Sequence, residues 1–315
     1  MANTVRVAVI QASPIFLDLE GSLEKAESLV RLAATEGAKV VAFGETWLPG
    51  YPAWIDEAPG AAFWNHAPAK KAFARLHANS LVVGGPESGR LAELARSSGV
   101  VLCMGINERI EHGPGHGTIY NSFLIYDADG SLANHHRKLV PTYTERLIWG
   151  TGDGKGLRSV NTACGRVGGL ICWEHWMPLA RQAMHDTAEK IHVALWPTVH
   201  EVHQLASRHY AFEGRCFVLA AGSLTAAGDL PPGLEARADA AAGGADRLLL
   251  RGGAAVIAPD GRFLAGPVFD DETTLYSDLD LEEIPREMQT LDTTGHYFRP
   301  DVFQLSVDRS RPTET

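Results

Sequence analysis

The chain contains 315 residues, of which 45% are hydrophobic and 21% charged, a composition typical of soluble globular proteins with one large domain or two ordinary ones. Its formal net charge of −10 and the absence of any basic run argue against nucleic-acid binding, which needs clustered Lys and Arg. No apolar stretch approaches the roughly 20 residues of a membrane span, so we expect no membrane partner.

The first segments of the chain alternate between strand and helix patterns. Residues 4–11 (TVRVAVIQ) alternate and are rich in Val and Ile, which predicts a strand. Residues 22–36 carry apolar side chains at helical spacing, and Gly37 follows as a helix stop. Residues 39–43 (KVVAF) predict a buried strand. The opening is therefore an α/β unit, and the Pro- and Gly-rich residues 48–60 after it predict a loop.

The remainder of the chain continues this alternation. Asp-Gly dipeptides at 129–130 and 260–261 predict hairpin turns. The other predicted elements are helices over 87–98, 176–188 and 201–214, and strands over 100–106, 118–126, 131–137, 166–172, 191–196, 217–222, 254–258 and 262–265. Such a pattern predicts mixed sheets covered by helices. We expect one domain over 1–315, with an exposed Ala-, Gly- and Asp-rich insertion at about 224–246 and a C-terminal tail at about 292–315.

The N-terminus and the cysteines bear on the cellular location. MANTVRVAVIQAS has an apolar run of strand length rather than the charged start and cleavage site of a signal peptide. The four cysteines form no CxxC pair and are interpreted as reduced thiols. We therefore expect a cytoplasmic protein.

Polar residues follow three of the predicted strands. Glu45 comes after KVVAFG, Lys138 after NHHR, and Cys172 after GGLI. Strand ends in α/β proteins open onto the crevice where ligands bind. Each residue alone has an ordinary explanation, because surface Glu and Lys are common and a free Cys is usually an inert small hydrophobe. Together they form a chemically sensible set.

A thiol becomes a good nucleophile only when it loses its proton. The ammonium of Lys138 and the start of a helix near Pro178 would both stabilise a Cys172 thiolate. A partly desolvated carboxylate at Glu45 could take the thiol proton and later activate water. Lys138 and the backbone N–H of Trp173 could then face negative charge on the attacked substrate.

Three motifs around these residues resemble those of the nitrilase superfamily, and more narrowly its nitrilase branch. They are FGETWLPGYP (43–52), HRKLVPTYTERLIWGTGDG (136–154) and GGLICWEHWMPLAR (168–181), and the resemblance is collinear from about residue 4 to residue 307. The resemblance implies Cys172 as nucleophile, Glu45 as general base, Lys138 as the cation at the tetrahedral intermediate, and Glu145 as a second glutamate that positions the substrate or assists lysine and water.

The resemblance also implies a fold and a reaction. The fold would be a four-layer α-β-β-α sandwich, and no metal or organic cofactor would be used. A small organic nitrile and water would be converted to a carboxylic acid and ammonia through thioimidate and thioester intermediates on sulfur, with some amide as a by-product. A homodimer or larger homo-oligomer is expected on the same basis.

Three aromatic residues, Trp173, Trp196 and Tyr51, are candidates for the substrate-binding wall, although each could equally belong to an ordinary aromatic core. An apolar wall would favour an aliphatic or arylaliphatic nitrile over a charged substrate. Glu174 either anchors the turn after Cys172 or forms a buried hydrogen bond of no further consequence.

The sequence leaves some other functions open and disfavours others. An amidase or carbamoyl hydrolase of the same superfamily would use the same residues, and cyanide hydration is a narrower possibility. A catalytically idle, self-assembling scaffold would have no chemical need for all four polar residues. A zinc site is disfavoured because only two residues separate His200 from His203, and a Ser-His-Asp hydrolase is disfavoured because no GxSxG occurs.

Overall fold

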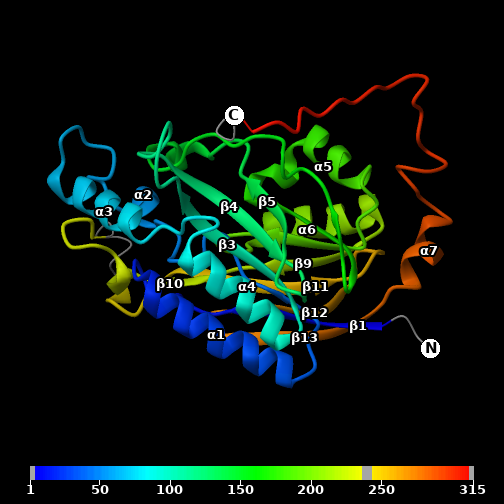
Figure 1. Ribbon diagram of the computed structural model, residues 1–315, viewed down its shortest axis with the longest axis horizontal. Helices are drawn as coiled ribbons and strands as arrows, with labels where there is room; N and C mark the ends of the chain where they lie inside the picture. Colours follow the sequence, from blue (N-terminus) through cyan, green and yellow to red (C-terminus); the bar gives the residue numbers. More distant parts are fainter. Residues whose placement is uncertain (1–3, 236–242, 312–315) are drawn as a thin grey trace.

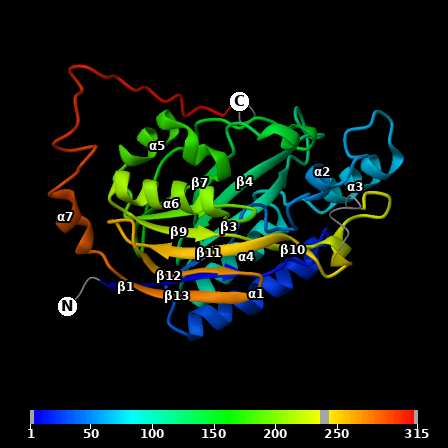
Figure 2. The same ribbon diagram turned by 180° about the vertical axis from the view of Figure 1, so that it is seen from behind.

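The computed structural model describes residues 4–235 and 243–311. Two mixed β-sheets pack face to face, and helices cover the outer face of each (Figures 1 and 2). The first sheet has the order β13-β1-β2-β3-β4-β5, and the second has β10-β11-β9-β8-β7-β6 with β12 paired to β11. The predicted fold class, mixed sheets in a four-layer α-β-β-α sandwich, is confirmed.

The strands of the first sheet are β1 (Thr4–Gln11), β2 (Val40–Ala42), β3 (Val101–Arg109), β4 (Ile119–Tyr126), β5 (Leu132–Arg137) and β13 (Thr273–Asp280). Those of the second are β6 (Val160–Thr162), β7 (Gly165–Ile171), β8 (Ile191–Leu195), β9 (Phe217–Ala221), β10 (Leu224–Ala226), β11 (Leu248–Ile257) and β12 (Phe263–Phe269). The helices are α1 (Leu19–Thr35), α2 (Trp54–Glu57), α3 (Ala67–Ala78), α4 (Pro86–Ser98), α5 (Pro178–His185), α6 (Glu201–Gly214) and α7 (Glu283–Met288). Short 3₁₀ turns are η1 (Tyr143–Leu147), η2 (Cys172–Trp176) and η3 (Ala227–Asp229).

The alternation of β1 explains the layering. Val7 and Val9 belong to the apolar core between the sheets, whereas Ala8 and Ile10 belong to the core under α1 and α4. Both sets are fully buried because successive strand residues point to opposite faces and each face of this sheet is covered. Helices α5 and α6 cover the second sheet in the same way (Figure 2).

Parallel pairing brings several strand ends to one edge of the sandwich. β1 and β2 are parallel, as are β7, β8 and β9. Each parallel pair is joined through a helix, as such connections require. The residues that follow β2, in the first sheet, and those that follow β7, in the second, therefore lie at this edge, where they can face each other.

The structure corrects several predicted elements. Strand β13 was not predicted, because TTLYSDLD mixes polar residues into its alternation and lies at the edge of its sheet. Helix α3 was not predicted either, since it buries only Ala72 and Leu76 and so lacks a strong apolar stripe. The predicted helix over 176–188 shortens to α5, because η2 precedes it and Pro178 stands in its first turn.

The segment expected as an insertion is partly ordered into the fold. It contributes β10 and η3, and β10 pairs with β11, which extends further toward the N-terminus than predicted. Pro231 and Pro232 of this segment line a pocket together with Pro68 of α3, and the described part of the segment lies beside that helix (Figures 1 and 2). Residues 236–242 of this segment, and 312–315 of the tail, lie outside the described part of the chain.

The C-terminal segment after α7 runs back across the α5 side of the molecule (Figure 1). The last described residue of this segment, Arg311, is 4% exposed, and its guanidinium donates to Asp153 at 2.7 Å and to the backbone oxygen of His135 at 2.9 Å. The segment is thereby fixed beside β5. Within the described residues, no helix combines the length and apolar composition needed to cross a membrane.

Candidate active site

Glu45, Lys138 and Cys172 lie together at the edge where their strands end. Glu45 follows β2, Lys138 follows β5, and Cys172 is the first residue after β7. All three are buried, with exposed fractions of 0%, 1% and 3%. The ligand atoms of Glu45, Glu145 and Cys172 all lie within 4.8 Å of one another. The structure thus brings the four polar residues of the sequence prediction into one cluster.

Lys138 is held between two carboxylates. Its Nζ donates to Glu45 Oε1 at 2.8 Å and to Glu145 Oε2 at 2.6 Å. Its backbone N–H donates to the Asn121 carbonyl of β4 at 2.8 Å, which fixes the chain direction at the end of β5. Gly152 approaches from the other side, where an added Cβ would lie 2.5 Å from the Lys138 carbonyl oxygen. The ammonium therefore has little freedom to leave the cluster.

The two glutamates differ in how many hydrogen bonds they accept. Glu145, in η1, accepts from the Thr142 N–H at 2.7 Å and from the Tyr51 hydroxyl at 3.2 Å, in addition to Lys138. Glu45 accepts through Oε1 from Lys138 and, at 2.6 Å, from Asn121 Nδ2, but its buried Oε2 has no hydrogen-bond partner. An acceptor that is buried and unsatisfied is costly, so the free Oε2 points to a use in proton transfer.

Cys172 stands on a sharp turn between β7 and η2. Its φ of 54° is left-handed, which is uncommon for a residue with a side chain and marks local strain at functional turns. Glu174 holds this turn: it accepts from the N–H of Ile171 at 2.7 Å, from the N–H of Leu139 at 2.8 Å, and from His136 Nε2 at 2.9 Å. Glu174 therefore connects the turn of Cys172 to the segment that carries Lys138, which resolves the alternative left open by the sequence.

The surroundings set the protonation of the cluster. Burial raises the pKa of Glu45 from 4.5 to about 7, although Lys138 opposes this rise. Burial also raises the pKa of the Cys172 thiol well above its ordinary value, and Glu45 adds to the rise, whereas Lys138 and the Trp173 N–H act against it. Burial disfavours the Lys138 ammonium, but Cys172 and the carboxylates outweigh burial and raise the Lys138 pKa.

These directions differ from the sequence expectation of a thiolate stabilised in the resting protein. Lysine is present as expected, but two carboxylates and burial outweigh it at Cys172. Burial and the two carboxylates thus favour the neutral thiol of Cys172, beside a Glu45 whose pKa is raised to about 7. The arrangement is suited to transfer of the thiol proton to Glu45 at the moment of nucleophilic attack.

Comparison with known proteins agrees with this geometry. Residues 6–286 match the carbon-nitrogen hydrolase family. The chain is 42% identical to an aliphatic nitrilase of Sinorhizobium fredii (strain HH103), over 96% of this chain and 95% of that protein. It is 40% identical to a bifunctional nitrilase/nitrile hydratase of Lupinus angustifolius, over 99% of this chain and 88% of that protein. The chain belongs to the carbon-nitrogen hydrolase family, in its nitrilase branch.

Solved structures share the fold at lower sequence identity. A carbon-nitrogen hydrolase from Helicobacter pylori G27 has a TM-score of 0.73 at 20% identity, covering 95% of this chain and 96% of that one. An amidase from Nesterenkonia sp. has a TM-score of 0.64 at 17% identity, covering 92% of this chain and 96% of that one. These similarities show only that this carbon-nitrogen hydrolase shares its fold with the two solved structures.

The three aromatic residues predicted as a substrate wall lie in different places. Tyr51 is 6% exposed and contacts Glu145 through its hydroxyl. Trp173 is 52% exposed, on the turn that carries Cys172. Trp196 is fully buried: its ring stacks between His175 and His203, and only its backbone oxygen contacts Glu45, accepting from the Glu45 N–H at 3.2 Å.

Asn121 is the residue of this cluster that sequence reasoning missed. It lies inside β4, where a single amide in an apolar strand gives no signal of its own. Its Nδ2 contacts Glu45, and its Oδ1 is buried without a partner.

Among the described residues, one group of His, Cys, Asp and Glu side chains has ligand atoms close enough to hold a metal ion, namely Glu45, Glu145 and Cys172. The Lys138 ammonium already lies between these two carboxylates and supplies the positive charge that a metal would bring. The group is therefore interpreted as an acid–base cluster of the hydrolase.

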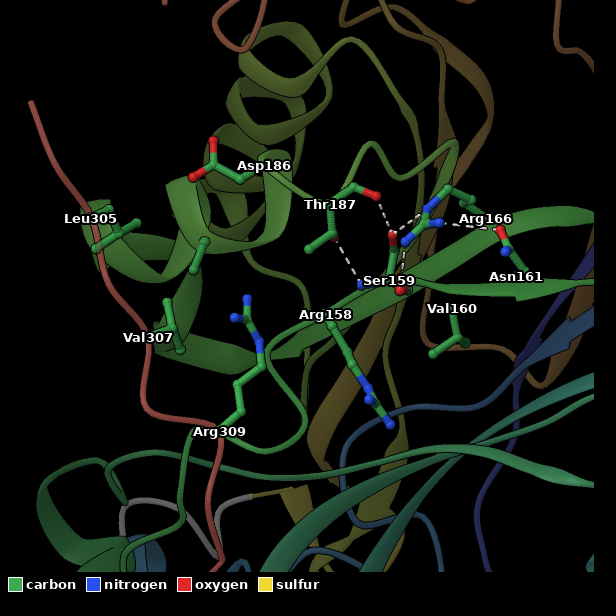
Figure 3. A pocket seen from close by; sticks show the side chains of 11 residues that line it. Arg158, Ser159, Val160, Asn161, Arg166, Asp186, Thr187, Leu305, Val307 and Arg309 are labelled. Carbon is green, nitrogen blue, oxygen red and sulfur yellow. Dashed lines mark hydrogen bonds between the residues drawn. The ribbon is translucent and has the colours of Figure 1, made fainter. Parts of the chain in front are cut away.

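A separate pocket of about 690 Å³ lies between β6, β7, α5 and the C-terminal segment (Figure 3). It is lined by Arg158, Arg166 and Arg309, but contains none of the predicted site residues. The Arg166 guanidinium donates to the Ser159 hydroxyl and to Asn161 Oδ1, so its charge already serves the β6–β7 hairpin. This pocket does not contribute to the hydrolase site.

Proposed function

We propose that this protein is a nitrilase that hydrolyses a small aliphatic or arylaliphatic nitrile to the carboxylic acid and ammonia. The observation that carries the proposal is the buried Cys172 beside a Glu45 whose Oε2 is free to accept a proton, with Lys138 bonded to both glutamates. Nitrilases at about 40% identity over nearly the whole chain support the choice of substrate class.

Each residue has a chemical role in this proposal. Cys172 is the nucleophile and Glu45 the general base. Lys138 faces the negative charge that develops on the substrate nitrogen, and the Trp173 N–H is a second donor to it. Glu145 holds Lys138 through a 2.6 Å hydrogen bond and is in turn held by Tyr51, so the ammonium is already in place when the substrate arrives.

The reaction then consumes two waters. Sulfur attacks the nitrile carbon while Glu45 takes the thiol proton and passes it to nitrogen, which gives a thioimidate. The first water adds to this carbon, the C–N bond breaks with a proton from Glu45, and ammonia leaves a thioester. A second water, activated by Glu45, cleaves the C–S bond to release the acid and restore the thiol. Cleavage of the C–S bond before ammonia leaves would release the amide.

Amide hydrolysis is the second candidate, because an amide or carbamoyl substrate would use the same four residues. The name of one structural neighbour, an amidase from Nesterenkonia sp., indicates that this fold includes amide hydrolysis. The name of one relative, a bifunctional nitrilase/nitrile hydratase, indicates that this branch includes conversion of a nitrile to its amide. Cyanide hydration remains a narrower alternative. The half-exposed Trp173 and the buried Tyr51 and Trp196 are the residues that we propose line the substrate wall.

Ammonia release should be measured for a panel of aliphatic and arylaliphatic nitriles and for the matching amides. We expect nitriles to be hydrolysed faster, and faster turnover of the amides would overturn the nitrilase assignment in favour of an amidase. Cys172→Ala should abolish turnover of both classes while the melting temperature changes little. Cys164→Ala is the matched control, because this thiol lies far from the cluster beside Lys39, and it should leave turnover unchanged.

The cellular setting follows from the same proposal. We propose a cytoplasmic enzyme, a single carbon-nitrogen hydrolase domain over 1–315, that assembles as a homodimer or larger homo-oligomer and uses no cofactor. Size-exclusion chromatography with light scattering tests the assembly, and a monomer at micromolar concentration would contradict it.

A further inference from the structure

A chain of buried polar side chains runs from the turn of Cys172 to a position beneath α6, and the proposed reaction does not use it. His175 Nδ1 bonds the backbone oxygen of Cys172 at 2.7 Å, and His175 Nε2 bonds His192 Nε2 at 2.9 Å. His192 Nδ1 bonds Glu189 Oε2 at 2.9 Å, and the Tyr210 hydroxyl donates to the other oxygen of Glu189. All of these side chains are at least 96% buried.

The chain has acceptors at both ends, which fixes its protons. A carbonyl oxygen and a carboxylate can only accept, so Nδ1 of His175 and Nδ1 of His192 both carry hydrogen. The bond between the two Nε2 atoms needs a third hydrogen, whereas two neutral imidazoles supply only two. The pair therefore shares one positive charge, which is balanced by Glu189 through its bond to His192 Nδ1.

The space for this ion pair is built into neighbouring residues. An added Cβ at Gly168 of β7 would lie 2.6 Å from Glu189 Oε2, so only glycine lets this carboxylate approach the strand. Burial raises the pKa of Glu189, but His192 and His185 outweigh burial and hold it below its usual range. The charged groups that face the histidine pair are Glu189 and, further out, His185 and Arg181.

The end of the chain acts on a peptide unit that the reaction does use. The Cys172 carbonyl and the Trp173 N–H belong to the same peptide, and in a trans peptide these two groups point in opposite directions. Holding the carbonyl toward His175 therefore aims the N–H back toward sulfur, where it contacts Cys172. A donor at the carbonyl also polarises the peptide and strengthens its N–H as a donor.

We propose that His175, supported by His192 and Glu189, is a positioning residue that aims and polarises the Trp173 N–H toward the sulfur and the developing charge on the substrate. The proposal rests on the proposed function for the identity of the substrate, but not for the contact between the N–H and sulfur. His175 itself touches neither the sulfur nor the reacting atoms; it acts through the Cys172–Trp173 peptide.

The test compares His175→Ala with His175→Asn, because an asparagine amide can replace Nδ1 as donor to the Cys172 carbonyl. Loss of a single oxyanion donor costs about 100- to 1,000-fold in kcat, so loss of its positioning group should cost about 10- to 100-fold with KM within about twofold. His175→Asn should recover kcat to within about fivefold of the parent. His192→Gln, which keeps a donor at the Nε2 position but not the charge, should fall between them.

His203→Ala is the matched control, because His203 stacks on the same Trp196 ring as His175 but does not contact the Cys172 peptide. It should lower the melting temperature as His175→Ala does while leaving kcat within about threefold of the parent. Equal losses of kcat in His203→Ala and His175→Ala would show that only packing matters, and would overturn the proposal.

A second readout requires no nitrile substrate. The rate at which iodoacetamide alkylates Cys172 reports its thiolate, and the N–H of Trp173 lowers the pKa of that thiol. In His175→Ala the pH profile of alkylation should move to higher pH, and in His175→Asn it should return. An unmoved profile in a folded His175→Ala would overturn the positioning role, whatever the substrate is. If His175→Ala does not fold, His192→Gln is compared with His175→Asn and with the parent. A His192→Gln variant whose kcat and alkylation profile both equal those of His175→Asn and of the parent would overturn the positioning role.

Discussion

Acidification should switch off this hydrolase through Glu45 at a higher pH than an ordinary carboxylate would allow. Only the carboxylate form can take the thiol proton, and burial raises the pKa of Glu45 from 4.5 to about 7. With that pKa, about a tenth of the molecules carry the active form near pH 6 and about a hundredth near pH 5. With the ordinary value, nearly all of them would still be active at about pH 6. We therefore expect kcat/KM to fall about tenfold per pH unit below about pH 7.

Substitution of Asn121 tests whether Glu45 is the residue whose titration causes this fall in kcat/KM. Its Nδ2 donates to Glu45 Oε1 at 2.6 Å and so lowers the Glu45 pKa. A hydrogen bond to a charged group is worth about 1.5–3 kcal/mol, so Asn121→Ala should move the acidic limb upward by about one pH unit or more. Asn134→Ala is the control, because this equally buried amide bonds the Gly156 carbonyl and has no contact with Glu45.

The assay is ammonia release between about pH 5 and 9, with circular dichroism at each pH to show that the fold persists. A profile that stays flat down to about pH 5 would contradict the raised pKa. An Asn121→Ala limb that coincides with the parent limb would show that another group, and not Glu45, titrates. Asn134→Ala should lower the whole profile or leave it unchanged, without displacing the limb.

Further predictions concern the framework of the site. In Glu174→Gln, one of the two buried backbone N–H groups of Ile171 and Leu139 faces an amide NH₂ instead of a carboxylate oxygen. Urea denaturation should therefore show a free energy of unfolding lower by about 2–4 kcal/mol. A loss below about 1 kcal/mol would argue against Glu174 as the residue that holds the two segments together. Gly152→Ala would press a Cβ against the Lys138 carbonyl and should lower kcat more than KM in steady-state kinetics. Arg311→Ala removes the 2.7 Å hydrogen bond to Asp153 and should lower the melting temperature by several degrees in scanning calorimetry. An unchanged melting temperature would show that the C-terminal segment does not stabilise the fold through this contact.

The parts of this molecule that were accessible from the sequence are those with a local signal. Alternation in residues 4–11 predicted β1, and the polar residues after apolar runs drew attention to Glu45, Lys138 and Cys172, which the structure brings into one cluster. Strand β13 carries a mixed pattern because it lies at the sheet edge beside β1, where burial does not enforce alternation.

Long-range contacts had no such signal. His175 and His192 are 17 residues apart and meet only because β7 and β8 are parallel neighbours in the second sheet. The single donor that Asn121 gives to Glu45 spans 76 residues, and nothing in an apolar strand distinguishes it from an amide that pairs with backbone. The sequence also showed the lysine near Cys172 but not the depth of burial, which raises the pKa of the thiol and so disfavours the expected thiolate.

That balance explains why a neutral thiol is compatible with nucleophilic catalysis here. Lys138 carries one positive charge against the carboxylates of Glu45 and Glu145, so a thiolate at Cys172 would add a further negative charge to a site with almost no water access. Transfer of the thiol proton to the free Oε2 of Glu45 leaves the net charge of the cluster unchanged. The buried cluster therefore disfavours an isolated thiolate but not the concerted transfer, and the raised pKa of Glu45 makes that carboxylate a better base for it.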